Sequence, residues 1–296
     1  MSNALEELDL PAWVARGPAD KRHFREAVHI ILTAIGKSTA LRSKMVMKGG
    51  LLMAIRYDST RFTRDADFST RDRYARGDDA ELLNELDQQL TWANEQFSYD
   101  AMCRRQRTKM DPNPPEEADF PGMKLNIGYA PRSNQRALAK LLSGQSTNVV
   151  EIDHSYNEAV FDVEVLRLAD GDTLQAYSFI NLIAEKLRAL LQQPVRRRNR
   201  EQDVYDLHLL LGLGHSFDRE ERHRLLHIFI VSCNSRRIEP TAKSLRDRQV
   251  RSMAEAGYET LKQDVEGPLP PFAVAYQIVQ DFYEGLPWSV VDRNFA

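Results

Sequence analysis

The sequence predicts an α+β protein in which a lobe built on a mixed sheet is followed by a helical lobe. Segments with alternating apolar residues, which are typical of strands, occur only before about residue 170. After that point, apolar residues recur three and four positions apart, as they do in amphipathic helices. A chain of 296 residues is long enough for two lobes. We predict that they span 20–170 and 171–296.

In the first lobe, apolar side chains at helical spacing predict a helix over 20–39, which Gly36 helps to end. A short apolar run and a glycine pair then predict a strand, a turn and the start of a helix. Alternation predicts the later strands, and the region 110–115 reads as a turn-rich break. The elements expected after the first helix are a strand at 45–50, a helix from 51–57, a strand at 64–69, a helix at 78–97, and strands at 123–129 and 159–166.

The helical lobe begins with a strongly periodic segment at 178–193, which Pro194 is expected to end because proline cannot donate a helical hydrogen bond. A helix over 201–211 should follow, bounded by Gly212. Further helices are predicted over 219–234, 241–264 and 272–284.

Composition excludes several classes of protein. Hydrophobic residues make up 42% of the chain and charged residues 28%, and no apolar run approaches the roughly 20 residues of a membrane helix. The N-terminus has no basic patch followed by an apolar stretch, so we expect no secretory signal and a cytoplasmic protein. Cys103 and Cys233 lie far apart in the sequence, which argues against a disulfide framework or a thiolate metal site.

The segment 64–69 carries the strongest chemical signal. In a strand, Asp65 and Asp67 would lie on the same face, where paired carboxylates can hold a divalent cation. Upstream, Gly49 and Gly50 would leave backbone N–H groups open to a phosphate at the start of a helix. An isolated Asp-x-Asp is more often a solvated pair, and an isolated Gly-Gly is usually a turn. Their combination favours metal-assisted nucleotidyl transfer.

Two arginine clusters stand out against a formal net charge of -3. One comprises Arg104, Arg105 and Arg107, and the other lies at 196–200. Local basic clusters can hold phosphates whatever the net charge, because salt screening confines their reach to roughly 8 to 10 Å. A solvated loop is the alternative interpretation of each cluster.

Two ordered blocks of residues resemble the AbiEii/AbiGii toxin-type nucleotidyltransferases of the polymerase-beta-like superfamily. The first combines the Lys-Gly-Gly turn at 48–50 with the run Arg-Phe-Thr-Arg-Asp-Ala-Asp-Phe at 61–68. The second combines Glu-Lys-Leu-Arg-Ala-Leu at 185–190 with Asp-Val-Tyr-Asp-Leu at 203–207, on either side of an arginine-rich turn. The resemblance spans most of the chain and implies a polymerase-beta-like nucleotidyltransferase lobe.

The resemblance implies that Asp65 and Asp67 are catalytic carboxylates and ligands of Mg²⁺. It also implies that the turn at 48–50, made of Lys48, Gly49 and Gly50, cradles the triphosphate of a bound nucleotide. Arg64 would add a phosphate contact, and so would Arg61. An exposed arginine is the alternative for both.

For the second block, the resemblance implies that Lys186 brings a compact positive charge to the phosphates, where charge develops during transfer. Asp203 would orient Lys186 or contact the nucleotide. Asp206, one helical turn later, would belong to the nucleotide-binding set. The alternatives are a solvated lysine and carboxylates that favour a helix N-terminus.

One position departs from the family pattern. Relatives offer a third carboxylate on the strand after the Asp-x-Asp, whereas the strand predicted at 123–129 presents Asn126. Asparagine cannot accept a proton, so either Asp67 acts as general base or another acid such as Glu164 does. Lys124 would share the face of Asn126 and is a possible phosphate contact.

The resemblance further implies a nucleoside triphosphate donor, an RNA acceptor expected to be the tRNA 3′ end, and a toxin whose cognate antitoxin is encoded nearby. The active site would lie in the cleft between the lobes. The antitoxin could neutralise the toxin by binding to it or by modifying a hydroxyl such as that of Thr63. Two alternatives are transfer to a protein or small molecule, and a catalytically silent nucleotide-binding module.

Overall fold

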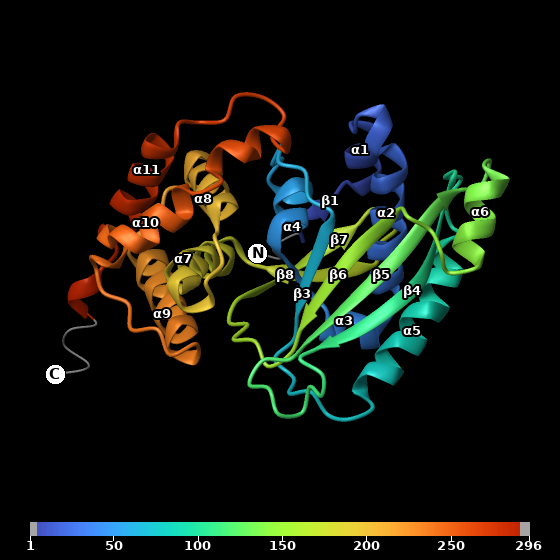
Figure 1. The fold of residues 1–296 in the computed structure, drawn as a ribbon, viewed down its shortest axis with the longest axis horizontal. Coiled ribbons are helices and arrows are strands. Elements are labelled where there is room, and N and C mark those ends of the chain that lie inside the picture. Colours follow the sequence, from blue (N-terminus) through green and yellow to red (C-terminus); the bar gives the residue numbers. More distant parts are fainter. Residues whose placement is uncertain (1–4, 291–296) are drawn as a thin grey trace. The chain divides into compact units, whose positions relative to one another are not determined.

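The computed structural model describes residues 5–290, which form two compact units. Among the described residues, unit 1 comprises 5–56 and 63–176, and unit 2 comprises 57–62 and 177–290. The sheet continues past residue 170 because a strand at Thr173–Tyr177 pairs with an earlier strand. Each unit therefore has its own secondary structure: the strands of the main sheet lie in unit 1, and the long helices from residue 179 onward lie in unit 2 (Figure 1).

Unit 1 is organised around an eight-stranded mixed sheet with the strand order β1-β7-β8-β2-β3-β6-β5-β4. The pairs β2/β3, β5/β6 and β4/β5 are antiparallel, whereas β3/β6, β2/β8 and β1/β7 are parallel. The mixed sheet expected from the sequence is thus confirmed. The strands are β1 (Glu7–Leu8), β2 (Val46–Lys48), β3 (Asp65–Ser69), β4 (Ala101–Asp111), β5 (Gly122–Pro131), β6 (Val149–Ser155), β7 (Val163–Leu168) and β8 (Thr173–Tyr177).

Helices cover one face of the strands β4, β5 and β6. Helix α2 (Arg22–Lys37) contacts all three strands, and α5 (Asp78–Ala93) contacts β4 (Figure 1). Alternate residues of β6 are buried on that side, including Val150 and Ile152. The intervening acidic residues of β6 face the other way, so the two faces of this part of the sheet differ sharply in polarity.

The remaining helices of unit 1 are shorter. They are α1 (Leu10–Ala15), the 3₁₀ turn η1 (Ala19–Lys21), α3 (Thr39–Lys44), α4 (Gly49–Arg56) and α6 (Gln135–Leu142). Helix α4 begins at Gly49 itself, so the glycine pair predicted as a turn before a helix at 51 forms the first two residues of the helix.

Four strands were not predicted, and the first of them, β1, is only two residues long. β4 spans the first arginine cluster, where a solvated loop was one interpretation and a break was placed at 110–115. Its charged residues hide the usual apolar alternation. β6 was overlooked although it alternates strictly, because its exposed positions carry charge. β8 is only five residues long. Tertiary pairing determines all four, since strand preference depends on the neighbours that a strand packs against.

Unit 2 is helical, as expected. Helix α7 (Phe179–Arg196) continues through Pro194, so the prediction that this proline ends the helix is wrong. Proline has no N–H to donate to the carbonyl of Leu190 four residues earlier. That carbonyl instead accepts a hydrogen bond of 3.0 Å from the side chain of Gln193. The helix ends at Arg197, which adopts a left-handed conformation with φ of 49°.

The other long helices of unit 2 are α8 (Glu201–Gly212), α9 (Arg219–Ser235) and α11 (Phe272–Glu284). The continuous helix predicted over 241–264 is broken into η2 (Ser244–Arg246), α10 (Arg248–Glu255) and η3 (Tyr258–Gln263). Asp247 starts α10 by accepting hydrogen bonds from the backbone of Gln249 and Val250. Gly257, with φ of 92°, separates α10 from η3. A short turn, η4 (Trp288–Val290), closes the described part of the chain.

Candidate active site

The glycine pair at the start of α4, directly after β2, brings the backbone against Asp67. Lys48 is the register partner of Asp67 across the antiparallel β2/β3 pair. Gly49, with φ of +72°, has a conformation that favours glycine, and a Cβ built on it would lie 1.9 Å from Oδ2 of Asp67. Gly50 is buried in the first turn of α4. Only a residue without a side chain fits between the helix start and this carboxylate.

The Asp-x-Asp segment forms β3 as predicted, with its two carboxylates on one face. Ala66 and Phe68 are fully buried on the opposite face, whereas Asp65 is exposed and Asp67 is half-buried. Arg64 precedes the strand and is exposed, and its carbonyl accepts a hydrogen bond from Glu151 N. The strand alternation thus aims both aspartates away from the core.

Two further carboxylates stand beside them on β6. In the parallel β3/β6 pair, Asp65 is the register partner of Glu151, and Asp67 is the register partner of Asp153. Neighbouring strands are about 4.8 Å apart, so four carboxylates occupy adjacent positions on one sheet face. The sequence interpretation missed this pair, although the alternation of Val150, Glu151, Ile152 and Asp153 was a signal that could have revealed it.

The strand order bears on whether Asn126 stands where relatives have a third carboxylate. β3 lies between β2 and β6, and Asn126 lies one strand beyond β6, opposite Glu151. Glu164 lies on β7, which is separated from β3 by β8 and β2, and its carboxylate forms an ion pair with Arg56. The expectation that a third carboxylate should stand at the position of Asn126 therefore misjudged which strand adjoins the aspartates.

The donor chemistry of this face fits a divalent cation. Carboxylate oxygens are the ligands that Mg²⁺ prefers, and Asp65, Asp67 and Asp153 supply them from adjacent positions. Within residues 5–290, however, no three His, Cys, Asp or Glu side chains are arranged so that together they could hold a metal ion. An open arrangement is the kind that Mg²⁺ uses when it shares its ligands with water and substrate phosphates.

The predicted residues of the second block form a buried cluster in unit 2. Lys186 on α7 is 5% exposed, and its ammonium donates to Oδ1 of Asp203 at 3.1 Å and to Oδ2 of Asp206 at 2.6 Å. Arg61 donates through Nε and Nη2 to the two oxygens of Asp206, at 3.0 and 2.9 Å. The spacing of Asp203 and Asp206 by one turn of α8 directs both carboxylates to Lys186.

The charges in this cluster stabilise one another. Burial alone would raise the pKa of the Asp206 carboxyl, but the charges and hydrogen bonds of Arg61 and Lys186 outweigh burial and lower the pKa to about 2. Burial would lower the pKa of Lys186, but Asp206 and Asp203 raise it. Asp206, Lys186 and Arg61 therefore all stay charged at neutral pH.

Within the cluster the two aspartates differ. Both oxygens of Asp206 are hydrogen-bonded and the residue is fully buried, so the geometry suits a positioning residue better than a direct nucleotide contact. Arg61 is likewise engaged with Asp206. By contrast, Oδ2 of Asp203 is buried without a hydrogen-bond partner among the described residues, and Arg200 Nη1 stands 3.9 Å from it. At 3.9 Å the two charges attract, but no hydrogen bond forms.

Comparison with known proteins decides the family. The family model "Nucleotidyl transferase AbiEii toxin, Type IV TA system" matches residues 31–283, which is most of the chain. The chain belongs to this AbiEii nucleotidyltransferase family. It is therefore a nucleotidyltransferase of a toxin-antitoxin type, and membership implies a nucleoside triphosphate substrate and an antitoxin partner. No curated protein sequence matches the chain.

One solved structure supports the fold of this AbiEii-family chain. JHP933 from Helicobacter pylori is similar with a TM-score of 0.54 and 14% sequence identity, over 94% of this chain and 96% of that chain. A second H. pylori structure, described as a proposed nucleotidyltransferase, has a TM-score of 0.43 and 14% identity, over 85% of this chain and 100% of that chain. At such identities the likeness concerns the fold alone.

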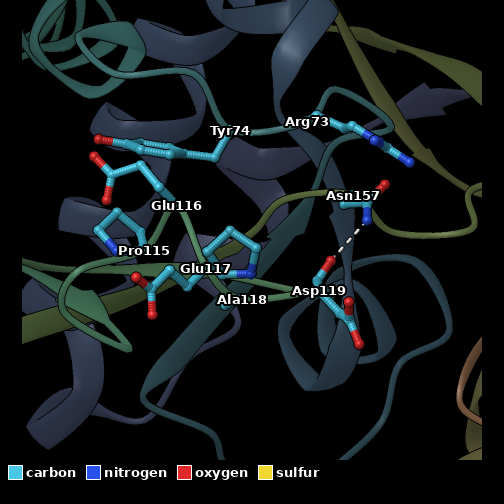
Figure 2. A pocket seen from close by; sticks show the side chains of 9 residues that line it. Arg73, Tyr74, Pro115, Glu116, Glu117, Ala118, Asp119 and Asn157 are labelled. Carbon is cyan, nitrogen blue, oxygen red and sulfur yellow. Dashed lines mark hydrogen bonds between the residues drawn. The ribbon is translucent and has the colours of Figure 1, made fainter.

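A cavity of about 270 Å³ in unit 1 of the AbiEii-family chain contains none of the predicted site residues. Its lining includes Tyr74, Glu116 and Glu117, and Asn157 donates a hydrogen bond to the carbonyl of Asp119 at its rim (Figure 2). Arg73 and Tyr74, which follow β3, line this cavity. The cavity therefore lies beyond the C-terminal end of β3, whereas Asp65 is at the N-terminal end of that strand. Its excess of carboxylates disfavours a triphosphate.

No helix among the described residues is long and apolar enough to cross a membrane.

Proposed function

We propose that this protein transfers a nucleotidyl group from a nucleoside triphosphate to the 3′ hydroxyl of an RNA, with the tRNA acceptor end as the expected acceptor. The row of Asp65, Asp67, Glu151 and Asp153 beside the glycine turn is the observation that carries this proposal. In the reaction, the acceptor hydroxyl forms a bond to the α-phosphorus of the donor. The bond to pyrophosphate breaks, and the hydroxyl proton passes to a base.

Asp65, Asp67 and Asp153 would hold Mg²⁺. When bound, Mg²⁺ neutralises triphosphate charge and stabilises the attacking and leaving oxygens. The protein's own contribution is to keep the carboxylates fixed on two hydrogen-bonded strands. Asp67 also lies against Gly49, so the backbone N–H groups at the start of α4 can approach a phosphate that a side chain would obstruct. Lys48 and exposed Arg64 would add positive charge to the same triphosphate.

A carboxylate of the sheet face would accept the proton of the acceptor hydroxyl. Glu151 and Asp153 add two candidates to Asp67, and each can take a proton whereas Asn126 cannot. This removes the need for Glu164, which is engaged with Arg56. The chemistry thus requires no acid from outside the β3/β6 pair.

In unit 2, Lys186 would act on the transferring phosphates as a preorganised positive charge. Asp203 would orient Lys186 through Oδ1, the oxygen that accepts the hydrogen bond from its ammonium. Asp206 and Arg61 would hold Lys186 in place. This division of roles explains why a fully buried aspartate belongs to the family pattern.

The proposal places the reaction in the cytoplasm, where nucleoside triphosphates and tRNA both occur, and makes its product a growth-arresting modification. A cognate antitoxin would neutralise the enzyme by binding or by modifying a hydroxyl. Thr63 is the candidate hydroxyl, because it is half-exposed and accepts a hydrogen bond from Asp65 N at 3.3 Å. Intact-mass analysis of toxin co-expressed with antitoxin should then show an added group that Thr63→Ala prevents. An unchanged mass would favour neutralisation by binding.

The deciding experiment incubates the purified chain with Mg²⁺, each α-labelled nucleoside triphosphate in turn, and total tRNA. Label should join the RNA with the wild-type protein, and should not do so with Asp65→Ala or when EDTA is present. Label on a protein or small molecule instead would support the alternative acceptors. Nucleotide binding without any transfer would support a catalytically silent module and would contradict the proposal.

A further inference from the structure

A row of basic residues extends from the carboxylates toward the edge of the sheet. Lys124 on β5 is the register partner of Asp153, and Lys109 on β4 is the register partner of Lys124. Two residues farther along β5, Asn126 lies opposite Glu151 of β6 and opposite Arg107 of β4. Register partners share a face, so these residues continue the face that carries Asp65 and Asp67.

A β-bulge places Arg107 on this face. The β4/β5 register shifts between Arg105 and Arg107, so that Gln106 is an additional residue in β4. Without it, strict alternation would pair Arg107 with Leu125, whose side chain is buried in the core. Arg105, before the bulge, points to the helix-covered face and forms an ion pair with Asp87 of α5. Bulges commonly re-aim side chains next to active sites.

The cations of this row are available to a ligand. Arg107 and Lys109 are exposed, and neither makes an ion pair or side-chain hydrogen bond with any residue between 5 and 290. Lys124 is 55% exposed and stands 3.7 Å from Asp153, at the border between the basic and acidic parts of the face. An exposed pair at this distance contributes little to stability, so a phosphate can compete for Lys124 at small cost.

We propose that Arg107, Lys109 and Lys124, here termed the basic strip, bind the phosphodiester backbone of the acceptor polynucleotide and lead its 3′ end to Asp65 and Asp67. This inference rests on the proposed function and specifies where its acceptor binds. Strand β4 lies three strand spacings from β3, about 14 Å, so the strip extends beyond the reach of a single nucleotide's phosphates. The charge changes sign along the face, as expected where a polyanion meets metal-binding carboxylates.

The test measures binding of a fluorescein-labelled single-stranded oligoribonucleotide by anisotropy, without nucleoside triphosphate, over a range of salt concentrations. The variants are the triple Arg107→Ala/Lys109→Ala/Lys124→Ala and the double Arg107→Ala/Lys109→Ala, which keeps the pair of Lys124 with Asp153. A matched control removes three exposed cations of unit 2 through Arg219→Ala/Lys243→Ala/Arg248→Ala. Charge-preserving Arg107→Lys/Lys109→Arg tests charge separately from folding, and thermal melting checks each variant.

Each phosphate contact to single-stranded nucleic acid contributes about 0.7 to the slope of log affinity against log salt. The triple variant should therefore lower the slope by about 2 and the double variant by about 1.4, with affinity at 0.1 M salt falling more than about 10-fold. The charge-preserving variant and the unit 2 control should bind nearly as the wild type does. Equal losses in the control and strip variants, or unchanged binding in the triple variant, would overturn the inference.

The two proposals fail separately. If the wild type labels RNA while the triple variant binds RNA with unchanged affinity, the basic strip is refuted and the reaction stands. If the triple variant loses RNA binding but the wild type labels no RNA, the strip remains a polynucleotide-binding surface and the proposed reaction falls.

Discussion

Arg61 and Asp206 are 145 residues apart in the chain, yet two hydrogen bonds of 3.0 and 2.9 Å join the guanidinium to both carboxylate oxygens. This pair ties the segment Tyr57–Phe62 to the helices of unit 2, and it shares Asp206 with Lys186. Paired guanidinium and carboxylate groups suit each other because their geometries match in two parallel bonds. The motif residue Arg61 thus has a structural partner that sequence spacing alone could not reveal.

Asp206→Asn should destabilise the protein by about 3–5 kcal/mol, because it removes one charge and leaves Arg61 and Lys186 buried with too little compensation. The native carboxyl has a pKa of about 2, below its ordinary value of 3.8, so its contribution is present above about pH 4 and is lost as the pH falls toward 2. Urea unfolding at pH 7 measures the loss. Asp281→Asn, at an exposed site on α11, is the control and should change stability by less than about 0.5 kcal/mol.

Asp153→Asn should lower nucleotidyl transfer by about 100-fold without changing the melting temperature, since it removes one of the proposed metal ligands from an accessible sheet face. Transfer assays at saturating and limiting Mg²⁺ would measure the effect, and a higher Mg²⁺ requirement should accompany the loss. Glu164→Gln, at the alternative acid on β7, should retain activity. Equal activity of Asp153→Asn and wild type would exclude Asp153 from the site.

Gly49→Ala should abolish transfer and destabilise unit 1, because the new Cβ would meet Oδ2 of Asp67 at 1.9 Å as well as straining a backbone with φ of +72°. Gly144→Ala is a close match: its φ is +73° and a Cβ there would meet nothing within 4 Å. The control should therefore cost only the left-handed strain, about 1–2 kcal/mol, and remain active. Similar losses of activity in both variants would show that strain, rather than the clash, is responsible.

His154 should make the protein sensitive to mild acid. The residue is buried in β6, neither ring nitrogen has a hydrogen-bond partner among the described residues, and burial together with Lys48 and Lys44 lowers its pKa to about 3. The unfolded state takes up a proton below about pH 6.5 whereas the folded state does not. The contribution of His154 to the free energy of unfolding is therefore fully present above about pH 6.5. It falls as the pH drops toward 3, by about 1.4 kcal/mol between pH 7.5 and 5.5.

His154→Phe removes that proton uptake. Between pH 7.5 and 5.5, the free energy of unfolding obtained from urea titrations should therefore fall by about 1.4 kcal/mol less in the variant than in the wild type. His29, whose pKa burial lowers to about 4, keeps its own contribution in both proteins. His227→Gln, at an exposed position on α9, should leave the pH dependence unchanged. An identical pH dependence in His154→Phe and wild type would mean that His154 is protonated without unfolding.

The sequence by itself determined the fold class and the side of β3 on which its aspartates lie. Alternation along Asp65, Ala66, Asp67 and Phe68 depends only on strand geometry, which places successive side chains on opposite faces. The spacing of Asp203 and Asp206 likewise predicted that both carboxylates share a helix face. Such local periodicities are written in the order of residues and need no knowledge of the partner strand or helix.

Only the tertiary structure decided which strand adjoins β3. Parallel pairing with β6 brings Glu151 and Asp153 beside the aspartates, although 86 residues separate Asp67 from Asp153, and moves Asn126 one strand away. The bulge at Gln106 decided which face Arg107 occupies. Strand order and bulges arise from non-local hydrogen bonding and packing, so the same local sequence is compatible with several neighbours until the chain folds.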